Sequence, residues 1–145
     1  MGIAVAQQEV ESSVTHDKPH AVLIVEDDPD SRELLTELLA AELPEAEVTS
    51  VATAEEALKS LQGRHVDAVV TDHTLPGMSG VELAIRLSER NPRPGLVLVS
   101  GHSTVEGSER FDAMIGKPLD VAELASTLRR LFERGQAAQG APAPG

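Results

Sequence analysis

Short apolar runs that no polar residue interrupts recur along this chain, and they constrain its fold more than any other feature. The clearest are residues 22–25 and 96–99, and residues 68–70 form a shorter run. Such runs are typical of strands that are buried on both faces. Between them, apolar residues recur at the spacing of an amphipathic helix. Strands that alternate with helices in this way predict a parallel sheet with helices on both faces, wound in two directions by right-handed crossovers.

Two further segments, residues 47–51 and 113–115, complete a predicted set of five strands. The stretch over residues 101–112 is short, contains Gly107 and lacks helical periodicity. We therefore expect the fourth helix of the pattern to be short, irregular, mobile or missing.

Local signals mark where the helices begin. Asp28 precedes Pro29, which predicts an N-cap followed by a proline in the first helical turn. Ser79 and Glu82 have the spacing of a capping box, and the last helix begins near Asp120. The apolar positions of the first helix are Leu34, Leu35, Leu38 and Leu39, and those of the last are Val121, Leu124, Ala125, Leu128, Leu131 and Phe132.

A length of 145 residues favours a single domain whose core needs no disulfide or metal support. The strand and helix pattern occupies residues 19–134. We expect residues 1–18 to form a flexible arm. Residues 135–145 contain only Gly, Gln, Ala and Pro, which predicts a disordered tail.

Composition argues against several functional classes. The chain has no cysteine, which excludes a disulfide scaffold and a thiol nucleophile. Its formal net charge is −12 and it has two phenylalanines but no tryptophan or tyrosine, so we expect no binding to nucleic acid or anionic membrane. Neither a signal peptide nor a bilayer-spanning stretch is visible, and we expect a cytoplasmic protein.

Polar residues follow the predicted strands at the same end of each. Glu26 and Asp27 follow the first strand, Asp72 the third, Ser100 the fourth and Lys117 the fifth. In a parallel sheet these ends share one edge, where doubly wound folds bind ligands. Carboxylates brought to about 4 Å of one another repel by about 4 kcal/mol at a surface-like dielectric. The cluster therefore needs a proton or a cation.

The residue types at this edge suit one kind of ligand. Carboxylate oxygens bind Mg²⁺, which usually keeps several waters and takes one or two carboxylates with phosphate oxygens. Lys117 adds a positive charge for an anionic oxygen, and Ser100 adds a hydrogen-bond donor. The sequence therefore predicts a site for a carboxylate, a divalent metal (Mg²⁺ or Mn²⁺) and a phosphoryl group together.

The motifs occur in a fixed order: Leu-Ile-Val-Glu-Asp-Asp at residues 23–28, Val-Val-Thr-Asp-His-Thr-Leu-Pro-Gly-Met-Ser-Gly at residues 69–80, Leu-Val-Ser at residues 98–100 and Lys-Pro at residues 117–118. In this order they resemble the receiver domain of two-component response regulators, over roughly residues 20–134. The resemblance implies a flavodoxin-like, doubly wound (βα)5 sandwich around a five-stranded parallel sheet. The short stretch before the last strand is similar to that of receivers attached to hybrid sensor kinases.

The resemblance implies roles for the acids. Asp72 is the phosphoacceptor, which takes the phosphoryl group from a phosphohistidine of a histidine kinase or histidine phosphotransfer protein. Asp27 and Asp72 bind the metal directly, and Glu26 acts mainly through a metal-bound water. The backbone carbonyl of Thr74 is a further ligand.

It also implies roles for three residues that respond to the phosphoryl group. Ser100 hydrogen-bonds the phosphoryl oxygens and reports the modification. Lys117 pairs with Asp72 or with the phosphoryl group, and its bond to Pro118 is cis. The family usually has Tyr or Phe three residues before the lysine as a switch, and Met114 stands there. Met114 is either the switch residue or a flexible core filler.

Other residues have simpler interpretations beside the functional ones. A hard oxygen site does not need His73 as a ligand, whereas Thr74 and His102 stand where side chains shape water access to the site. Phe111 is expected in the core. His20 and His65 are expected to be solvated.

These observations predict a single-domain response regulator with no attached output domain, which catalyses only its own phosphorylation and slow dephosphorylation. It would signal to an unknown downstream protein, as a monomer or a phosphorylation-dependent homodimer. Two alternatives remain. One is a protein-interaction module that works without phosphorylation. The other is a Mg²⁺-dependent phosphatase, suggested by Asp28 and Asp30, although Arg32 departs from the residue usual in that motif.

Overall fold

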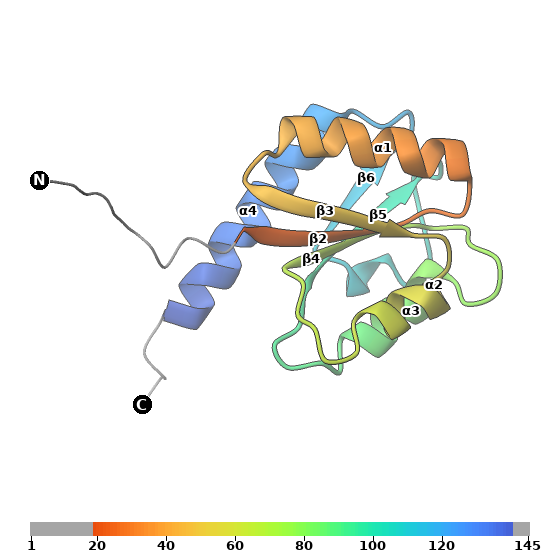
Figure 1. Ribbon diagram of the computed structural model, residues 1–145. Coiled ribbons are helices and arrows are strands. Elements are labelled where there is room, and N and C mark those ends of the chain that lie inside the picture. Colours follow the sequence, from red (N-terminus) through yellow and green to blue (C-terminus); the bar gives the residue numbers. More distant parts are fainter. Residues whose placement is uncertain (1–18, 141–145) are drawn as a thin grey trace, which may run out of the picture.

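A computed structural model of the protein describes residues 19–140, and side chains as far as residue 135. Five parallel strands form a sheet in the order β3-β2-β4-β5-β6. Helices α1 and α4 cover one face of this sheet and α2 and α3 the other (Figure 1). The elements are β2 (His20–Val25), α1 (Pro29–Glu42), β3 (Ala46–Val51), α2 (Ala54–Ser60), β4 (Ala68–Asp72), α3 (Gly80–Leu87), β5 (Gly95–Ser100), the 3-10 turn η2 (Ser108–Arg110), β6 (Ala113–Gly116) and α4 (Val121–Gly140).

The predicted flavodoxin-like fold is confirmed, and its strand order places the functional edge. The chain passes from β2 outward to β3 and then crosses back to β4 on the other side of β2. Strand order therefore reverses between β2 and β4, and the crevice beyond their C-terminal ends is where such folds bind ligands. The predicted arm over residues 1–18 lies outside the described residues.

Burial on both faces explains the uninterrupted apolar runs. In β2, Val22 and Ile24 belong to the core under α1 and α4, whereas Leu23 and Val25 belong to the core under α2 and α3. Alternate side chains of a strand point to opposite faces. A strand with helices on both sides must therefore be apolar at every position.

The helices begin where the sequence predicts. The side chain of Asp28 accepts the N–H of Ser31 at 2.8 Å, and Pro29 stands in the first turn of α1. Ser79 and Glu82 form the reciprocal hydrogen bonds of a capping box at the start of α3. Asp28 thus serves as the helix cap that the sequence predicts.

The segment between β5 and β6 contains no α-helix, only the 3-10 turn η2, as the sequence predicts. Val105 is buried, and Gly107 has φ of 89°. A Cβ on Gly107 would lie 2.6 Å from Cγ1 of Val81 on α3. Only glycine combines this backbone conformation with so close an approach, so the turn packs directly on α3.

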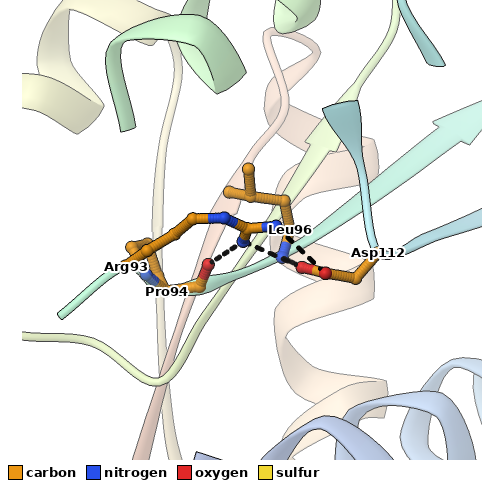
Figure 2. Close-up of polar contacts among 4 residues, drawn as sticks. All are labelled: Arg93, Pro94, Leu96 and Asp112. Carbon is orange, nitrogen blue, oxygen red and sulfur yellow. Dashed lines mark hydrogen bonds and ion pairs between the residues drawn. The ribbon is translucent and has the colours of Figure 1, made fainter. Parts of the chain in front are cut away.

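An ion pair between Arg93 and Asp112 lies next to the start of β6 (Figure 2). Nη1 and Nη2 of Arg93 donate to the two carboxylate oxygens of Asp112, each at 3.0 Å. The same carboxylate accepts the N–H of Leu96 at 2.7 Å, and the N–H of Asp112 donates to the carbonyl of Leu96 at 2.8 Å. Asp112 therefore joins the start of β6 to β5 from both its backbone and its side chain.

The last helix is longer than predicted. It continues past Arg134 to Gly140, whereas a disordered tail was expected from residue 135. Alanine and glutamine are good helix formers, and an existing helix gains one hydrogen bond for each residue it adds. Low complexity alone was therefore a poor guide to the end of α4. Residues 141–145 lie outside the described part.

We expect Asp112→Ala to lower the free energy of unfolding by about 2 kcal/mol, because the Leu96 N–H and the Arg93 guanidinium lose a charged acceptor. Glu109→Ala, a change at an exposed residue of η2, is the control and should stay within about 0.5 kcal/mol of wild type. Urea unfolding followed by far-UV circular dichroism measures both. Equal stability of the two variants would contradict the role given to Asp112.

Candidate functional site

Each of four strands delivers one or more predicted site residues to the same edge of the sheet. Glu26 and Asp27 directly follow β2, and Asp72 is the last residue of β4. Ser100 is the last residue of β5, and Lys117 directly follows β6. The structure thus brings these residues together at the strand ends, as the sequence predicts.

The acids and the lysine approach each other closely. One carboxylate oxygen from each of Glu26, Asp27 and Asp72 lies within 4.8 Å of the others. Nζ of Lys117 is 3.0 Å from Oδ1 of Asp72, and the same oxygen accepts the N–H of His73 at 3.0 Å. The Asp72 side chain is 13% exposed, so solvent screens this ion pair only in part.

Gly80 lets the first turn of α3 lie against the end of β4. A Cβ at this position would be 2.6 Å from the carbonyl oxygen of Asp72. The hydroxyl of Thr71 donates to that carbonyl at 3.0 Å. Because a backbone atom is the obstacle, a larger residue would displace Asp72 itself.

Among the three acids of the cluster, Glu26 has a raised pKa. Burial raises the pKa of its carboxyl, and the charges of Asp72 and Asp27 raise it further. The N–H of Asp28, 3.1 Å from Oε2 of Glu26, and the Lys117 ammonium act in the opposite direction, but the pKa stays above its ordinary value. A nearby divalent cation would favour the charged form.

The donor set suits a hard divalent cation. Among residues 19–135, the only group of three potential ligand side chains within this range is Glu26, Asp27 and Asp72, and all three supply carboxylate oxygens. Asp27 is exposed, so an ion can reach it from solvent. Oxygen ligands of this kind fit Mg²⁺ or Mn²⁺. His73 faces His102 edge-on, with 6.0 Å between ring centroids.

The remaining predicted residues differ in how they are placed. Ser100 is buried, and its Oγ accepts the N–H of His102 at 3.0 Å. Thr74 is exposed just after β4. The Lys117–Pro118 bond is cis. Met114 is 40% exposed on the edge strand β6, so its interpretation as a core filler is wrong.

Two ring residues outside the site also bear on the sequence interpretation. Phe111 packs at the margin of the core under α2 and α3, as expected. His20 stacks on Phe132 with ring centroids 4.1 Å apart, so it is not simply solvated. The last helix, whose position relative to β2 the sequence alone does not give, supplies that partner.

A cleft of about 310 Å³ opens beside the acids. Its walls include Glu26, Asp72 and Lys117 and also three leucines of α1, Leu34, Leu35 and Leu38. Leu34 is 57% exposed and Leu38 is 44% exposed, although their spacing resembles that of core residues. The apolar face of α1 therefore continues from the core into solvent, next to the site.

Arg32 is a site residue that the sequence did not reveal. Its guanidinium donates to the carbonyls of Glu26 and Asp27, from the first turns of α1. The sequence shows only that Arg32 lies one helical turn after the Asp28 cap and five residues after Asp27. Without the structure, nothing distinguished it from an ordinary surface arginine.

Comparison with known proteins decides the family. The model of the family described as "Response regulator receiver domain" matches residues 22–129. This chain belongs to that family. No helix in the described part of the receiver has the length and hydropathy to span a bilayer.

The curated relatives of this receiver are longer proteins, and the receiver matches only part of each. It is 35% identical over 113 residues to protein-glutamate methylesterase/protein-glutamine glutaminase 1 of Syntrophus aciditrophicus, covering 77% of this chain and 32% of that protein. It is 32% identical over 123 residues to the transcriptional regulatory protein TcrA of Mycobacterium tuberculosis, covering 79% of this chain and 46% of that one. The chain thus spans less than half the length of these relatives.

Solved structures agree with the fold. The CheY-like receiver domain from Methylobacillus flagellatus is 31% identical, with a TM-score of 0.71 over 79% of this chain and 99% of that one. The response regulator TrrA from Thermotoga maritima, solved in complex with Mg²⁺ and BeF, is 30% identical, with a TM-score of 0.70 over 77% of this chain and 98% of that one.

The raised pKa of Glu26 predicts a pH-dependent stability. The folded state binds the proton of the Glu26 carboxyl more tightly than the unfolded state does, in which the pKa is near 4.5. The protonated carboxyl therefore contributes to the free energy of unfolding. This contribution is complete below pH 4.5 and is lost as the pH rises through the pKa of the folded state. In EDTA, Glu26→Gln should therefore be more stable than wild type at pH 7, by a margin that shrinks as the pH falls toward 4.5.

Thermal unfolding between pH 4 and pH 8 measures this margin, with the exposed Glu33→Gln on α1 as the control. A Glu26→Gln variant that is less stable than wild type at pH 7 would contradict the raised pKa of Glu26.

Proposed function

We propose that this receiver accepts a phosphoryl group on Asp72 from the phosphohistidine of a histidine kinase or a histidine phosphotransfer protein. The observation that carries the proposal is the 3.0 Å contact between Lys117 and Asp72 beside two further carboxylates within 4.8 Å. A nucleophile, a fixed cation and a set of metal ligands are together what phosphoryl transfer by positioning and charge neutralisation requires.

The transfer exchanges one bond to phosphorus for another. A carboxylate oxygen of Asp72 attacks the phosphorus, the new O–P bond forms an acyl phosphate, and the N–P bond of the donor breaks. The imidazole nitrogen leaves with the electron pair and takes up a proton. The receiver supplies the nucleophile and the site, and we propose no activity on other substrates.

The chain's own residues neutralise and orient the transferred group. The Lys117 ammonium is already at Asp72 and would hold a phosphoryl oxygen once Asp72 is modified. Ser100, which now accepts the N–H of His102, would turn its hydroxyl to donate to another phosphoryl oxygen. Loss of the Ser100–His102 hydrogen bond would carry the change into the segment before η2.

Asp27, Asp72 and the Thr74 carbonyl would hold a Mg²⁺ or Mn²⁺ ion directly, with Glu26 acting mainly through water. When bound, the ion would offset the negative charge of the acids and of the incoming phosphoryl oxygens. The carboxylate cluster and the raised pKa of Glu26 support this assignment.

We further propose that the phosphohistidine donor docks on α1. Leu34 and Leu38 are the exposed large apolar residues of this helix, and they line the cleft that holds Asp72. An apolar helix face beside the nucleophile would seat a helix that carries the phosphohistidine. Output would then be by contact with a downstream protein, as a monomer or a phosphorylation-dependent homodimer, in the cytoplasm.

Acetyl phosphate with Mg²⁺ should add one phosphoryl group to the wild type, measured as intact mass. Asp72→Asn should gain none, since the amide is not a nucleophile of this kind, and EDTA should prevent the addition. Lys117→Met should slow it by about a hundredfold, the loss expected for one group that stabilises transferred charge. Wild-type protein unmodified by acetyl phosphate and by phosphorylated kinases alike would favour the phosphorylation-independent interaction module.

The docking face is tested separately from the chemistry. The double variant Leu34→Asn, Leu38→Asn should accept phosphate from acetyl phosphate at the wild-type rate. Its rate of transfer from autophosphorylated histidine kinases, screened as a panel, should fall by about tenfold or more, as for interface anchors. Ile85→Asn, at an exposed position on α3 across the sheet, is the control. Equal transfer to all three proteins would rule out docking on α1.

A further inference from the structure

The turn that carries the acid pair is held from the helix that follows it. Nη1 of Arg32 donates to the carbonyl of Glu26 at 3.0 Å and, more weakly, to the carbonyl of Asp27 at 3.4 Å. Arg32 is partly buried, and its own N–H donates to the carbonyl of Asp28 at 2.8 Å in the first turn of α1. One guanidinium therefore bridges two consecutive carbonyls of the turn.

These carbonyls matter because the turn has left the sheet. The N–H of Glu26 still donates to the carbonyl of Val51 on β3, at 3.1 Å. Beyond that point the β2–β4 ladder ends, with Val25 opposite Thr71. The directions of the Glu26 and Asp27 side chains then depend on the backbone angles of the turn, and Arg32 fixes the carbonyl side of those peptide units.

We propose that Arg32 is a positioning residue of the metal site. It contacts neither the ion nor the phosphoryl group, and it holds the Glu26 and Asp27 backbone so that both carboxylates face Asp72. This inference rests on the proposed function, because it assumes that the three acids bind a divalent cation. Removing a group that orients metal ligands without touching the metal typically weakens metal affinity by about 10–100-fold.

Charge and geometry make opposite predictions for Arg32, which allows a decisive test. As a cation near the acids, Arg32 repels a divalent ion, so on charge alone its removal should tighten metal binding. As a positioning residue, its removal lets the carboxylates spread and should weaken metal binding. The sign of the change in affinity therefore separates the two roles.

The experiment compares Arg32→Met, Arg32→Lys and wild type in the full chain. Arg32→Met keeps the aliphatic stem and loses every donor, whereas Arg32→Lys keeps the charge and one donor group. Arg86→Met, at an exposed arginine of α3 away from the acids, is the matched control. Mg²⁺ affinity is measured by calorimetry and Mn²⁺ affinity by electron paramagnetic resonance. Far-UV circular dichroism and thermal unfolding in EDTA show that each variant is folded.

We expect Arg32→Met to bind Mg²⁺ and Mn²⁺ about tenfold more weakly than wild type, Arg32→Lys to recover part of the loss, and Arg86→Met to match wild type. Unchanged or tighter binding by Arg32→Met would overturn the inference, as would a fall in melting temperature with wild-type affinity. If Arg32→Met does not fold, Arg32→Lys decides: binding about threefold weaker supports the inference, and wild-type binding overturns it. Failure of the wild type itself to bind either ion would instead reject the metal site and, with it, the proposed function.

Discussion

The parallel pairing of β2 with β4 is the constraint on which the rest of the structure depends. Its register sets Val25 opposite Thr71, so the next residues, Glu26 and Asp72, emerge side by side at the edge of the sheet. Both strands are buried on two faces, and a slip of one residue would turn every side chain of β2 to the wrong core. The apolar packing that fixes the fold thus also fixes the spacing of the acids.

The site brings three carboxylates close together, and two different kinds of contact hold them there. Lys117 supplies a direct counter-charge to Asp72, whereas Arg32 holds the backbone of the acid pair. Burial, more than the neighbouring carboxylates, still raises the pKa of Glu26, and the contacts that Glu26 makes do not fully offset this effect. A divalent cation beside the three carboxylates would stabilise the charged form of Glu26.

The segment between β5 and β6 shows how a receiver can do without a long helix at this place. Gly107 lets the turn lie against Val81 of α3, and Asp112 secures the start of β6 through Arg93 and Leu96. Lys117 follows the other end of β6, so this anchorage contributes to the position of the lysine. Met114 is exposed on the edge strand, whereas Ser100 is buried and its hydrogen bond from the His102 N–H joins the end of β5 to this segment.

The sequence by itself determined the strands, the helix caps and the edge at which the site residues meet. These features follow from local rules: apolar runs for strands buried on two faces, Asp28 and Ser79 as caps, and the shared direction of parallel strands. The short η2 was also readable, since residues 101–112 hold too little helical periodicity. Low complexity misled at the end of α4, where helix propagation continued through alanine and glutamine.

Only the tertiary structure decided which side chains meet across the sequence. Helical spacing cannot tell that Leu34 and Leu38 lie past the edge of the core, because that depends on where α1 sits on the sheet. Nor can it tell that Asp112 pairs with Arg93, 19 residues earlier in the chain. The sequence also cannot predict the two hydrogen bonds from the Arg32 guanidinium. Their acceptors are backbone carbonyls, which every residue has.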